Sequence, residues 1–476
     1  MRAIILGMDG LDPNLLEKWW DDLPNFRRLR DEGMFARVSS VFPPDSVPAW
    51  ASIYTGLSPD HHGILDSIDY LDAKKKDLSC DTTVLTGNTF WDTAGRSGKR
   101  VCVINPFLAY PVWPVNGIMV NGPVFVTGDV QSYPESVTTE HQVPELGGIV
   151  GTPTKKTLEP FREHTWNLTL NHLGFAKELF AREKWGLFFM NFLSLDRIQH
   201  SFWRFCDPAD PTYPGKNPYS EVIADFYRLH DRIVGEFLEL MDEDCTLIVL
   251  SDHGHGMRCT KAFYVNEFLR RQGLLRSSAG KFGLKYLMER AKSIALRTLD
   301  KYDLHDLGYK IGGWLPGAKA LKKSTYVIDK SASSAQVARF SGMNPYGGIE
   351  LPRSAFQGDD REYDEMVGRL IKGLLAVEDP HTRRPVVRWA KRREEMFDGP
   401  YAYIYPEVVF QLDFEYGVGR SLFGPLIDVN PSHRKVSGGH MPDASLLANR
   451  ALALPEDNSI VSTAEMVLGV LGVDER

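Results

Sequence analysis

The chain has 476 residues, which is enough for a large core and for two to three domains, or for one large α/β domain with an insertion. Its 55 Lys and Arg stand against 62 Asp and Glu, and this mildly acidic balance excludes a general polyanion binder, so nucleic acid is not an expected partner. No run approaches the roughly 18 consecutive apolar residues of a transmembrane helix.

The first ten residues, MRAIILGMDG, predict a buried strand and not a signal peptide. The five cysteines are scattered and never form a CxxC pair, which argues against a disulfide framework and against a structural zinc site. We therefore expect a cytoplasmic protein with reduced thiols and no transmembrane segment.

Near-continuous apolar runs predict parallel strands that are covered on both faces. These runs are AIILGMD (3–9), VCVIN (101–105), GLFFMNFLSLD (186–196) and TLIVLSD (246–252). Segments with helical spacing of apolar residues lie between them, for instance 175–184 and 221–243. The alternation predicts an α/β fold, a three-layer αβα sandwich with a mostly parallel central sheet.

Three of these runs end in an acidic residue: Asp9, Asp196 and Asp252. Aspartate is also a common turn residue at a strand end, and one such acid would carry no further meaning. In an open α/β sheet, however, the carboxyl ends of parallel strands meet at one edge, where ligands bind. We therefore expect the three carboxylates to converge.

The alternation breaks between about residues 257 and 345. From Arg276 to Ser324 there are eleven Lys and Arg against four Asp and Glu, a local balance of +7. We expect a core formed by 1–256 and 346–476, and a basic, mainly helical insertion or lid at 257–345. Its charge would favour an anionic substrate, and a solvated helix face is the alternative interpretation.

Ser46 lies in FPPDSVPAWAS (42–52), ahead of a short predicted helix. A serine at a helix N-terminus can cap the helix, and the helix dipole there favours an anion. We expect Ser46 to cap this helix and to be able to attack a substrate through the same oxygen.

Histidines accompany the acids. Asp196 and His200 form a DxxxH pattern that one helical turn places on the same face, His253 follows Asp252, and His440 follows two glycines. Three Asp and three His provide the mixed carboxylate and imidazole ligands that zinc or manganese uses, enough for two ions with open positions. Two such ions, about 3.5–4 Å apart, are suited to in-line displacement at phosphorus, and a coordinated serine becomes a nucleophile.

The ordered motifs MDG (8–10), PPDSVPAWASIYTG (43–56), DRIQH (196–200), SDHG (251–254) and GGH (438–440) resemble those of the alkaline phosphatase superfamily. They are most similar to its type I phosphodiesterase/nucleotide pyrophosphatase branch, in the subgroup called phosphohydrolase/phosphomutase-like. The stretches at 105–123, GGIELP and DPHTRRPVV are similar to that subgroup too, so the resemblance extends over most of the chain.

The resemblance implies an alkaline-phosphatase-like core that holds two divalent ions, with zinc expected first and manganese second. One ion would be held by Asp9, Asp252, His253 and the Ser46 oxygen, and the other by Asp196, His200 and His440. Hydrolysis of a small anionic phosphate ester, a phosphodiester or pyrophosphate, would pass through a phosphoseryl intermediate on Ser46.

The sequence departs from the family pattern at several positions. Counting 21 residues from the nucleophile, where nucleotide pyrophosphatases have an asparagine that contacts phosphate, gives Ser67. His255 stands where a bulky apolar residue is expected, either as a substrate contact or as a partly buried histidine with satisfied hydrogen bonds. The nucleophile is Ser where many relatives have Thr.

Other members of the superfamily fit less well. Sulfatases carry C/S-x-P-x-R, and Trp50 replaces that arginine. Cofactor-independent phosphoglycerate mutase has its extra domain at a different place. A phosphomonoesterase or phosphomutase remains the alternative, although Trp50 and the aromatic residues at 107–125 favour a wall for the second group of a diester. A non-catalytic protein that binds metal and anions is a further alternative.

Overall fold

The computed structural model describes residues 1–65, 82–124, 128–148, 151–277, 331–338, 343–356, 360–454 and 457–473, with single positions at 291, 294, 295, 298, 303, 304, 328, 329 and 340. Contacts divide the chain into two compact units. The first is Met1–Met257 with Gly438–Arg476, and the second is Arg258–Ser437.

An eight-stranded sheet forms the centre of the first unit, in the order β2-β17-β7-β1-β6-β3-β4-β5. The strands are β1 (Arg2–Met8), β2 (Met34–Ser39), β3 (Val101–Ile104), β4 (Gly117–Asn121), β5 (Gln131–Tyr133), β6 (Leu187–Phe192), β7 (Cys245–Leu250) and β17 (Asp443–Ala448). The run from β7 to β4 is parallel, whereas β17, β2 and β5 pair antiparallel. The four predicted strands are β1, β3, β6 and β7, and the mostly parallel sheet is confirmed.

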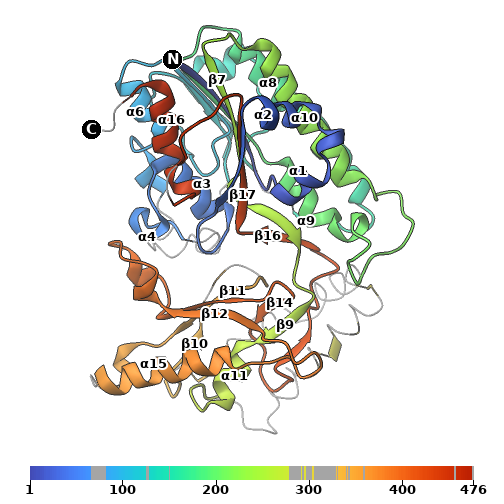
Figure 1. Ribbon diagram of the computed structural model, residues 1–476, viewed down its shortest axis with the longest axis vertical. Helices are drawn as coiled ribbons and strands as arrows, with labels where there is room; N and C mark the ends of the chain where they lie inside the picture. The colour runs from blue at the N-terminus through green and yellow to red at the C-terminus, as the bar shows by residue number, and fades with distance from the viewer. Residues whose placement is uncertain are drawn as a thin grey trace. The chain divides into compact units, whose positions relative to one another are not determined.

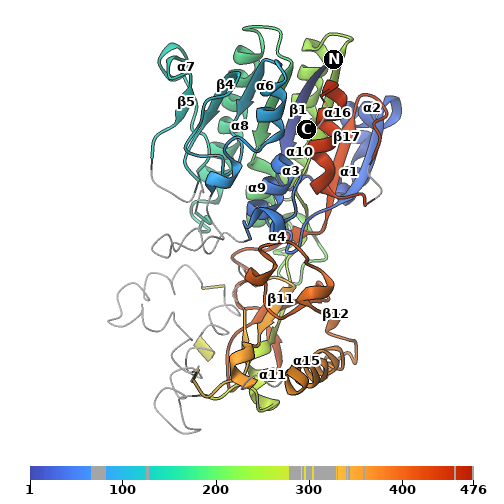
Figure 2. The same cartoon turned by 90° about the vertical axis from the view of Figure 1, so that its left-hand side faces the viewer.

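Helices cover both faces of this sheet (Figures 1 and 2). The helices of the first unit are α1 (Pro13–Lys18), α2 (Pro24–Glu32), α3 (Ser46–Thr55), α4 (Pro59–His62), α6 (Phe90–Arg96), α7 (Ser136–Glu140), α8 (Leu158–Phe180), α9 (Ser194–Cys206), α10 (Val222–Leu240) and α16 (Thr463–Leu471). Side chains of β1 alternate between two apolar clusters, since Ile4 and Leu6 pack with α2, α8, α9 and α10, and Ala3 and Ile5 pack with α3, α6 and α16. The result is the predicted three-layer sandwich.

A separate two-stranded antiparallel ladder includes the strand that follows β7 in the chain. It pairs β8 (Gly254–Met257) with β16 (Gly438–Met441), and His255 stands opposite His440. A Cβ on Gly438 would lie 2.6 Å from the His255 ring, so only glycine leaves room for that ring. The ladder thus brings two distant histidines to one place.

The second unit contains two small sheets, a four-stranded one in the order β10-β11-β13-β12 and a three-stranded one in the order β14-β9-β15. Its elements are β9 (Lys261–Tyr264), α11 (Val265–Arg271), β10 (Gln336–Val337), β11 (Tyr346–Glu350), α15 (Asp360–Leu375), β12 (Val387–Arg392), β13 (Val408–Leu412), β14 (Tyr416–Gly419) and β15 (Ile427–Val429). A third apolar cluster unites these sheets with α11 and α15.

The second unit begins at Arg258, close to the predicted residue 257, but it ends at Ser437 and not at residue 345. Residues 346–437 belong to it because β11, β12 and β13 pair with β10 or with one another, and β14 and β15 pair with β9. Within 257–345, the described residues include strands β9 and β10 as well as helix α11. The basic stretch from Arg276 to Ser324 lies largely outside the described residues, so its predicted helices and lid role remain predictions.

Within the described part of the chain, no helix combines the length and the apolar character that crossing a bilayer demands.

His230, on α10, supports the helix that carries two of the predicted site residues. The ring is buried, its Nδ1–H donates to the Phe226 carbonyl at 2.8 Å, and Nε2 accepts from the Ser194 hydroxyl at the start of α9 at 3.2 Å. Burial lowers the pKa of His230 to about 4. His230 therefore takes up a proton at about pH 6.5 in the unfolded chain, but only at about pH 4 in the folded chain.

We expect the free energy of unfolding to fall as the pH drops from about 6.5 to about 4, with His230 contributing up to about 1.4 kcal/mol per pH unit. In His230→Gln this contribution disappears, because glutamine does not titrate. Urea unfolding of both proteins between pH 7.5 and 4.5 measures the difference. Parallel pH profiles would show that His230 does not contribute to acid sensitivity.

Candidate active site

Two carboxylates of the site lie just after adjacent parallel strands. Asp9 follows β1 and Asp252 follows β7 after one residue, and both side chains are buried. The turn after β1 holds them together, because the Gly10 N–H donates to Asp252 Oδ1 at 3.1 Å. Gly10 has a φ of +72°, and a Cβ there would lie 3.2 Å from the Asp196 Cα, so the tight turn requires glycine.

Asp9, Asp252 and His253 form a buried cluster whose ligand atoms all lie within 4.8 Å of one another. His253 Nε2 is 3.2 Å from Asp252 Oδ2 and 3.8 Å from Asp9 Oδ1. His253 Nδ1 donates to the Gly254 carbonyl at 3.0 Å, which directs the lone pair on Nε2 toward the carboxylates. We call this set the aspartate-rich cluster.

The carboxylates of this cluster lack sufficient positive charge. Burial raises the pKa of Asp9 well above its usual range, and the charges of Asp252 and Asp196 raise it further. Burial, followed by the charge of Asp196, also outweighs the Gly10 hydrogen bond and raises the pKa of Asp252 to about 7. Burial and the neighbouring His440 lower the pKa of His253, which keeps it neutral. A divalent cation would stabilise the ionised form of these buried carboxylates, and a neutral imidazole can bind it, so the residues fit such an ion.

Ser46 stands at the edge of this cluster and is half-buried. It is the first residue of α3, and its Oγ lies 3.1 Å from His253 Nε2 and 3.4 Å from Asp9 Oδ1. The expectation that Ser46 caps the helix is wrong, because Asp45 is the cap and its carboxylate accepts from the Val47 N–H at 3.1 Å. The Ser46 hydroxyl is therefore left for the cluster.

The helix end offers fewer free donors than the sequence suggested. The Val47 N–H is taken by Asp45, Pro48 has no N–H, and the Ala49 N–H donates to the Asp45 carbonyl. The donors of Val47 and Ala49 are thus not available to an anion at the start of α3.

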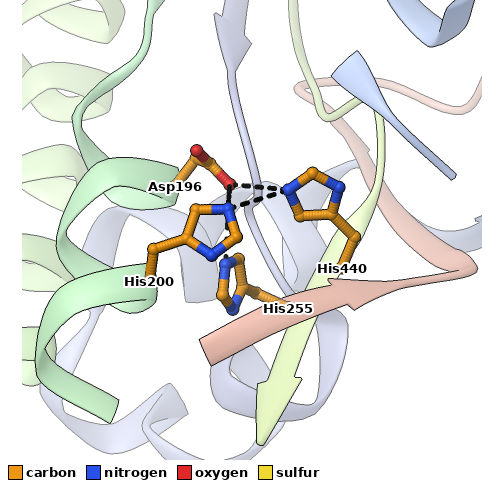
Figure 3. Close-up of side chains that lie close together, drawn as sticks. All are labelled: Asp196, His200, His255 and His440. Atoms are coloured by element: carbon orange, nitrogen blue, oxygen red, sulfur yellow. Dashed lines mark hydrogen bonds and ion pairs between the residues drawn. The ribbon is translucent and has the colours of Figure 1, made fainter. Parts of the chain in front are cut away.

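The second cluster contains Asp196, His200, His255 and His440, and Figure 3 shows the three imidazoles gathered around the carboxylate. Asp196 does not end a strand as predicted but lies in the first turn of α9, and His200 follows one turn later on the same face. Asp196 Oδ1 is 3.1 Å from His200 Nε2, 3.3 Å from His440 Nε2 and 3.5 Å from His255 Nε2. We call this set the histidine-rich cluster.

Backbone carbonyls orient two of these rings. His200 Nδ1 donates to the Gly438 carbonyl at 2.9 Å, and His440 Nδ1 donates to the Pro44 carbonyl at 3.0 Å. In the neutral rings both Nε2 atoms then carry lone pairs, yet they lie only 2.9 Å apart and face the same carboxylate oxygen. Converging lone pairs repel unless a cation or a proton lies among them, and carbonyl-anchored imidazoles are the usual ligands of protein metal sites. The residues fit a divalent ion here as well.

Without such an ion, a proton takes its place. Burial alone would lower the pKa of His440, but its hydrogen bond with Asp196 and the charges of Asp196, Asp45 and Asp252 raise it to about 9. Burial would likewise raise the pKa of Asp196, but the charge of His200 and the contacts with the three rings lower it well below its usual range.

The two clusters adjoin. The rings of His253 and His440 stack with centroids 3.8 Å apart and an interplanar angle of 20°. All seven predicted metal ligands, from Asp9 to His440, therefore gather in one site within the first unit.

The predicted substrate residues fare differently. Trp50 does not form a wall for substrate, because its side chain is buried; its indole N–H donates to Asp9 Oδ2 at 2.9 Å. Its role as a hydrogen-bond donor to a cluster carboxylate was missed in the sequence, where only its spacing of four residues from Ser46 hinted at the same helix face. Ser67 lies outside the described residues.

In the described part of the aromatic loop at 107–125, two of the rings are also unavailable as a wall for substrate. Phe107 and Trp113 are buried in the apolar core, and the Trp113 indole N–H donates to Asp92. Tyr110 donates to the Asp129 carbonyl, and residue 125 is outside the described residues. His255, expected either as a substrate contact or as a partly buried histidine with satisfied hydrogen bonds, is fully buried, and its ring makes no hydrogen bond with a described residue.

A family model of type I phosphodiesterase / nucleotide pyrophosphatase matches residues 3–310. The chain belongs to this family. The resemblance of the motifs to the type I phosphodiesterase/nucleotide pyrophosphatase branch is confirmed.

Curated members of the family are similar over part of their length. Mouse ectonucleotide pyrophosphatase/phosphodiesterase family member 3 is 29% identical over 152 residues, which cover 30% of this chain and 16% of that protein. Rat family member 1 is 22% identical over 276 residues, covering 56% of this chain and 25% of that protein. The chain thus spans a quarter or less of the length of these relatives.

A solved structure shares the fold. Phosphonoacetate hydrolase from Sinorhizobium meliloti 1021, in complex with phosphonoacetate, has a TM-score of 0.58 and 16% identity, with 99% of this chain and 95% of that chain covered. This likeness confirms the predicted fold class.

Trp50→Phe keeps most of the ring and removes the N–H that Asp9 accepts. We expect the ion of the aspartate-rich cluster to bind about 10- to 100-fold more weakly, the usual cost of losing a group that orients a metal ligand. Competition between the protein and a chromophoric chelator for zinc measures the affinity.

Trp113→Phe is the matched control, because it removes a buried indole hydrogen bond to Asp92 away from the site. Equal zinc affinities for Trp50→Phe and Trp113→Phe would contradict the orienting role of Trp50.

Proposed function

We propose that the protein hydrolyses a phosphodiester or pyrophosphate bond of a small anionic substrate with two divalent ions, and that Ser46 forms a covalent phosphoseryl intermediate. The family supports phosphoester hydrolysis as the chemistry. The finer proposal rests on the position of Ser46 Oγ. This oxygen does not cap helix α3, and it lies within 3.4 Å of both His253 Nε2 and Asp9 Oδ1.

The two clusters supply the ligands for the ions. The aspartate-rich cluster with Ser46 Oγ would hold one ion, and Asp196, His200 and His440 would hold the other, with zinc proposed first and manganese second. When bound, the ions would supply the positive charge that lowers the pKa of the serine hydroxyl and balances the phosphoryl and leaving oxygens.

The residues of the chain fix the geometry of attack. Ser46 Oγ gives up its proton and bonds to phosphorus, while the bond from phosphorus to the leaving oxygen breaks and that oxygen takes up a proton. Water then attacks the phosphoseryl phosphorus, releasing the phosphate product and restoring the serine hydroxyl. Trp50 and the Gly10 N–H keep the carboxylates in place during both half-reactions, through their hydrogen bonds to Asp9 and Asp252.

Ser46→Ala tests the nucleophile. With bis-p-nitrophenyl phosphate and zinc or manganese, we expect the wild-type protein to release p-nitrophenolate and the variant to be slower by a factor on the order of 10³ or more. Ser58→Ala is the control, since its half-buried hydroxyl contacts Asp60 and His61 and not the clusters. Full activity of Ser46→Ala, or no release by the wild-type protein with either metal, would refute the mechanism.

The alternative, a phosphomonoesterase or phosphomutase, differs in substrate class. Because the aromatic residues at 50, 107 and 113 are buried, the preference for a diester now rests on the family alone. We expect a higher kcat/KM for bis-p-nitrophenyl phosphate than for p-nitrophenyl phosphate under identical metal loading. Faster cleavage of the monoester would favour the alternative instead.

A further inference from the structure

We propose that His255 is a fourth protein ligand of the ion in the histidine-rich cluster, in addition to Asp196, His200 and His440. The inference rests on the proposed metal centre and names a ligand beyond the set that the family resemblance implies. Three observations carry it: the place of His255 in a strand ladder, the surroundings of its ring, and the lack of a hydrogen bond to either ring nitrogen among the described residues.

The ladder of β8 and β16 places His255 beside an expected ligand. His255 is the direct antiparallel partner of His440, and directly opposed residues project their side chains on the same face of a ladder. The His255 ring centroid is 4.6 Å from that of His200 and 5.8 Å from that of His440. The backbone pairing therefore brings the His255 ring into the cluster.

The ring is held in this orientation by its surroundings. The indole of Trp203 stacks on it, with centroids 5.9 Å apart and an interplanar angle of 23°. The missing side chain of Gly438 leaves the space that the ring fills. The backbone N–H of His255 donates to Asp12 Oδ2 at 3.1 Å, which fixes the start of β8.

The nitrogens of this ring have no hydrogen bonds among the described residues, although the side chain is fully buried. An unsatisfied buried polar group costs about 1–3 kcal/mol, and a phenyl ring could fill the same space without that cost. Nε2 is the nitrogen that lies toward the cluster, 3.5 Å from Asp196 Oδ1, the oxygen on which His200 and His440 also converge. A cation shared with these groups would satisfy the Nε2 lone pair.

An imidazole binds metal through the lone pair of its neutral form. Four protein ligands would fill a tetrahedral zinc site, whereas a catalytic zinc site keeps three protein ligands and one open position. His255 would thus raise the number of protein ligands at the histidine-rich cluster to four. A substrate oxygen would then have to bind as a fifth ligand or displace His255.

Metal binding by the full chain tests the proposal. The protein is stripped with dipicolinic acid and reloaded with zinc or cobalt(II), and chelator competition gives the affinity of each ion. His255→Gln removes the ring, and His255→Phe keeps a ring to pack against Trp203, so that folding is preserved in at least one variant. His200→Ala is the reference for loss of a ligand, and His172→Gln, a buried histidine bonded to the Glu145 carbonyl, is the matched control.

We expect two ions in the wild-type protein and in His172→Gln. In both His255 variants one of the two ions should bind at least about tenfold more weakly, since even the loss of an outer-shell partner costs that much, and the other ion should be unaffected. The visible absorption of cobalt(II) at the weakened site should change as well, because the coordination number changes.

Two ions with wild-type affinity and an unchanged cobalt spectrum in both His255 variants would overturn this inference while leaving the proposed function intact. A wild-type protein that binds no divalent ion would overturn both.

Discussion

The burial of several carboxylates close to one another is the constraint on which the site depends. The parallel strands β7, β1 and β6 are neighbours, so whatever follows them is brought together, and here Asp252, Asp9 and Asp196 follow. Burial and the neighbouring charges raise the pKa of Asp9 and Asp252. The donors around them, the Gly10 N–H and the Trp50 indole, relieve only part of this charge. Divalent cations would balance the remaining charge.

The central sheet and most of the site could be predicted because their signals are local. Buried parallel strands appear as continuous apolar runs, and a DxxxH pattern on a helix specifies the face that Asp196 and His200 share. The extent of the second unit could not be predicted, because it depends on pairings between strands far apart in the chain, such as β9 with β14. The capping residue was also ambiguous, since Asp45 and Ser46 are adjacent and both residue types cap helices.

The aromatic residues near Ser46 were misinterpreted for a different reason. Composition does not distinguish a ring that faces substrate from a ring that faces the core, and Trp50 and Trp113 both face the core. Each buried indole N–H needs an acceptor, and each finds a carboxylate, Asp9 in one case and Asp92 in the other. Burial thus turned an expected substrate contact into a support for a predicted metal ligand.

The two clusters differ in charge, and this asymmetry bears on their division of labour. The aspartate-rich cluster carries two carboxylates, so a divalent ion there would be neutralised before the serine oxygen is counted. The histidine-rich cluster has one carboxylate and neutral imidazoles, and a divalent ion there would keep a net positive charge. A developing negative charge on a leaving oxygen is best stabilised where positive charge remains. In the proposed mechanism, the surplus of histidine over aspartate around Asp196 would therefore suit that cluster to the leaving group and the other cluster to Ser46.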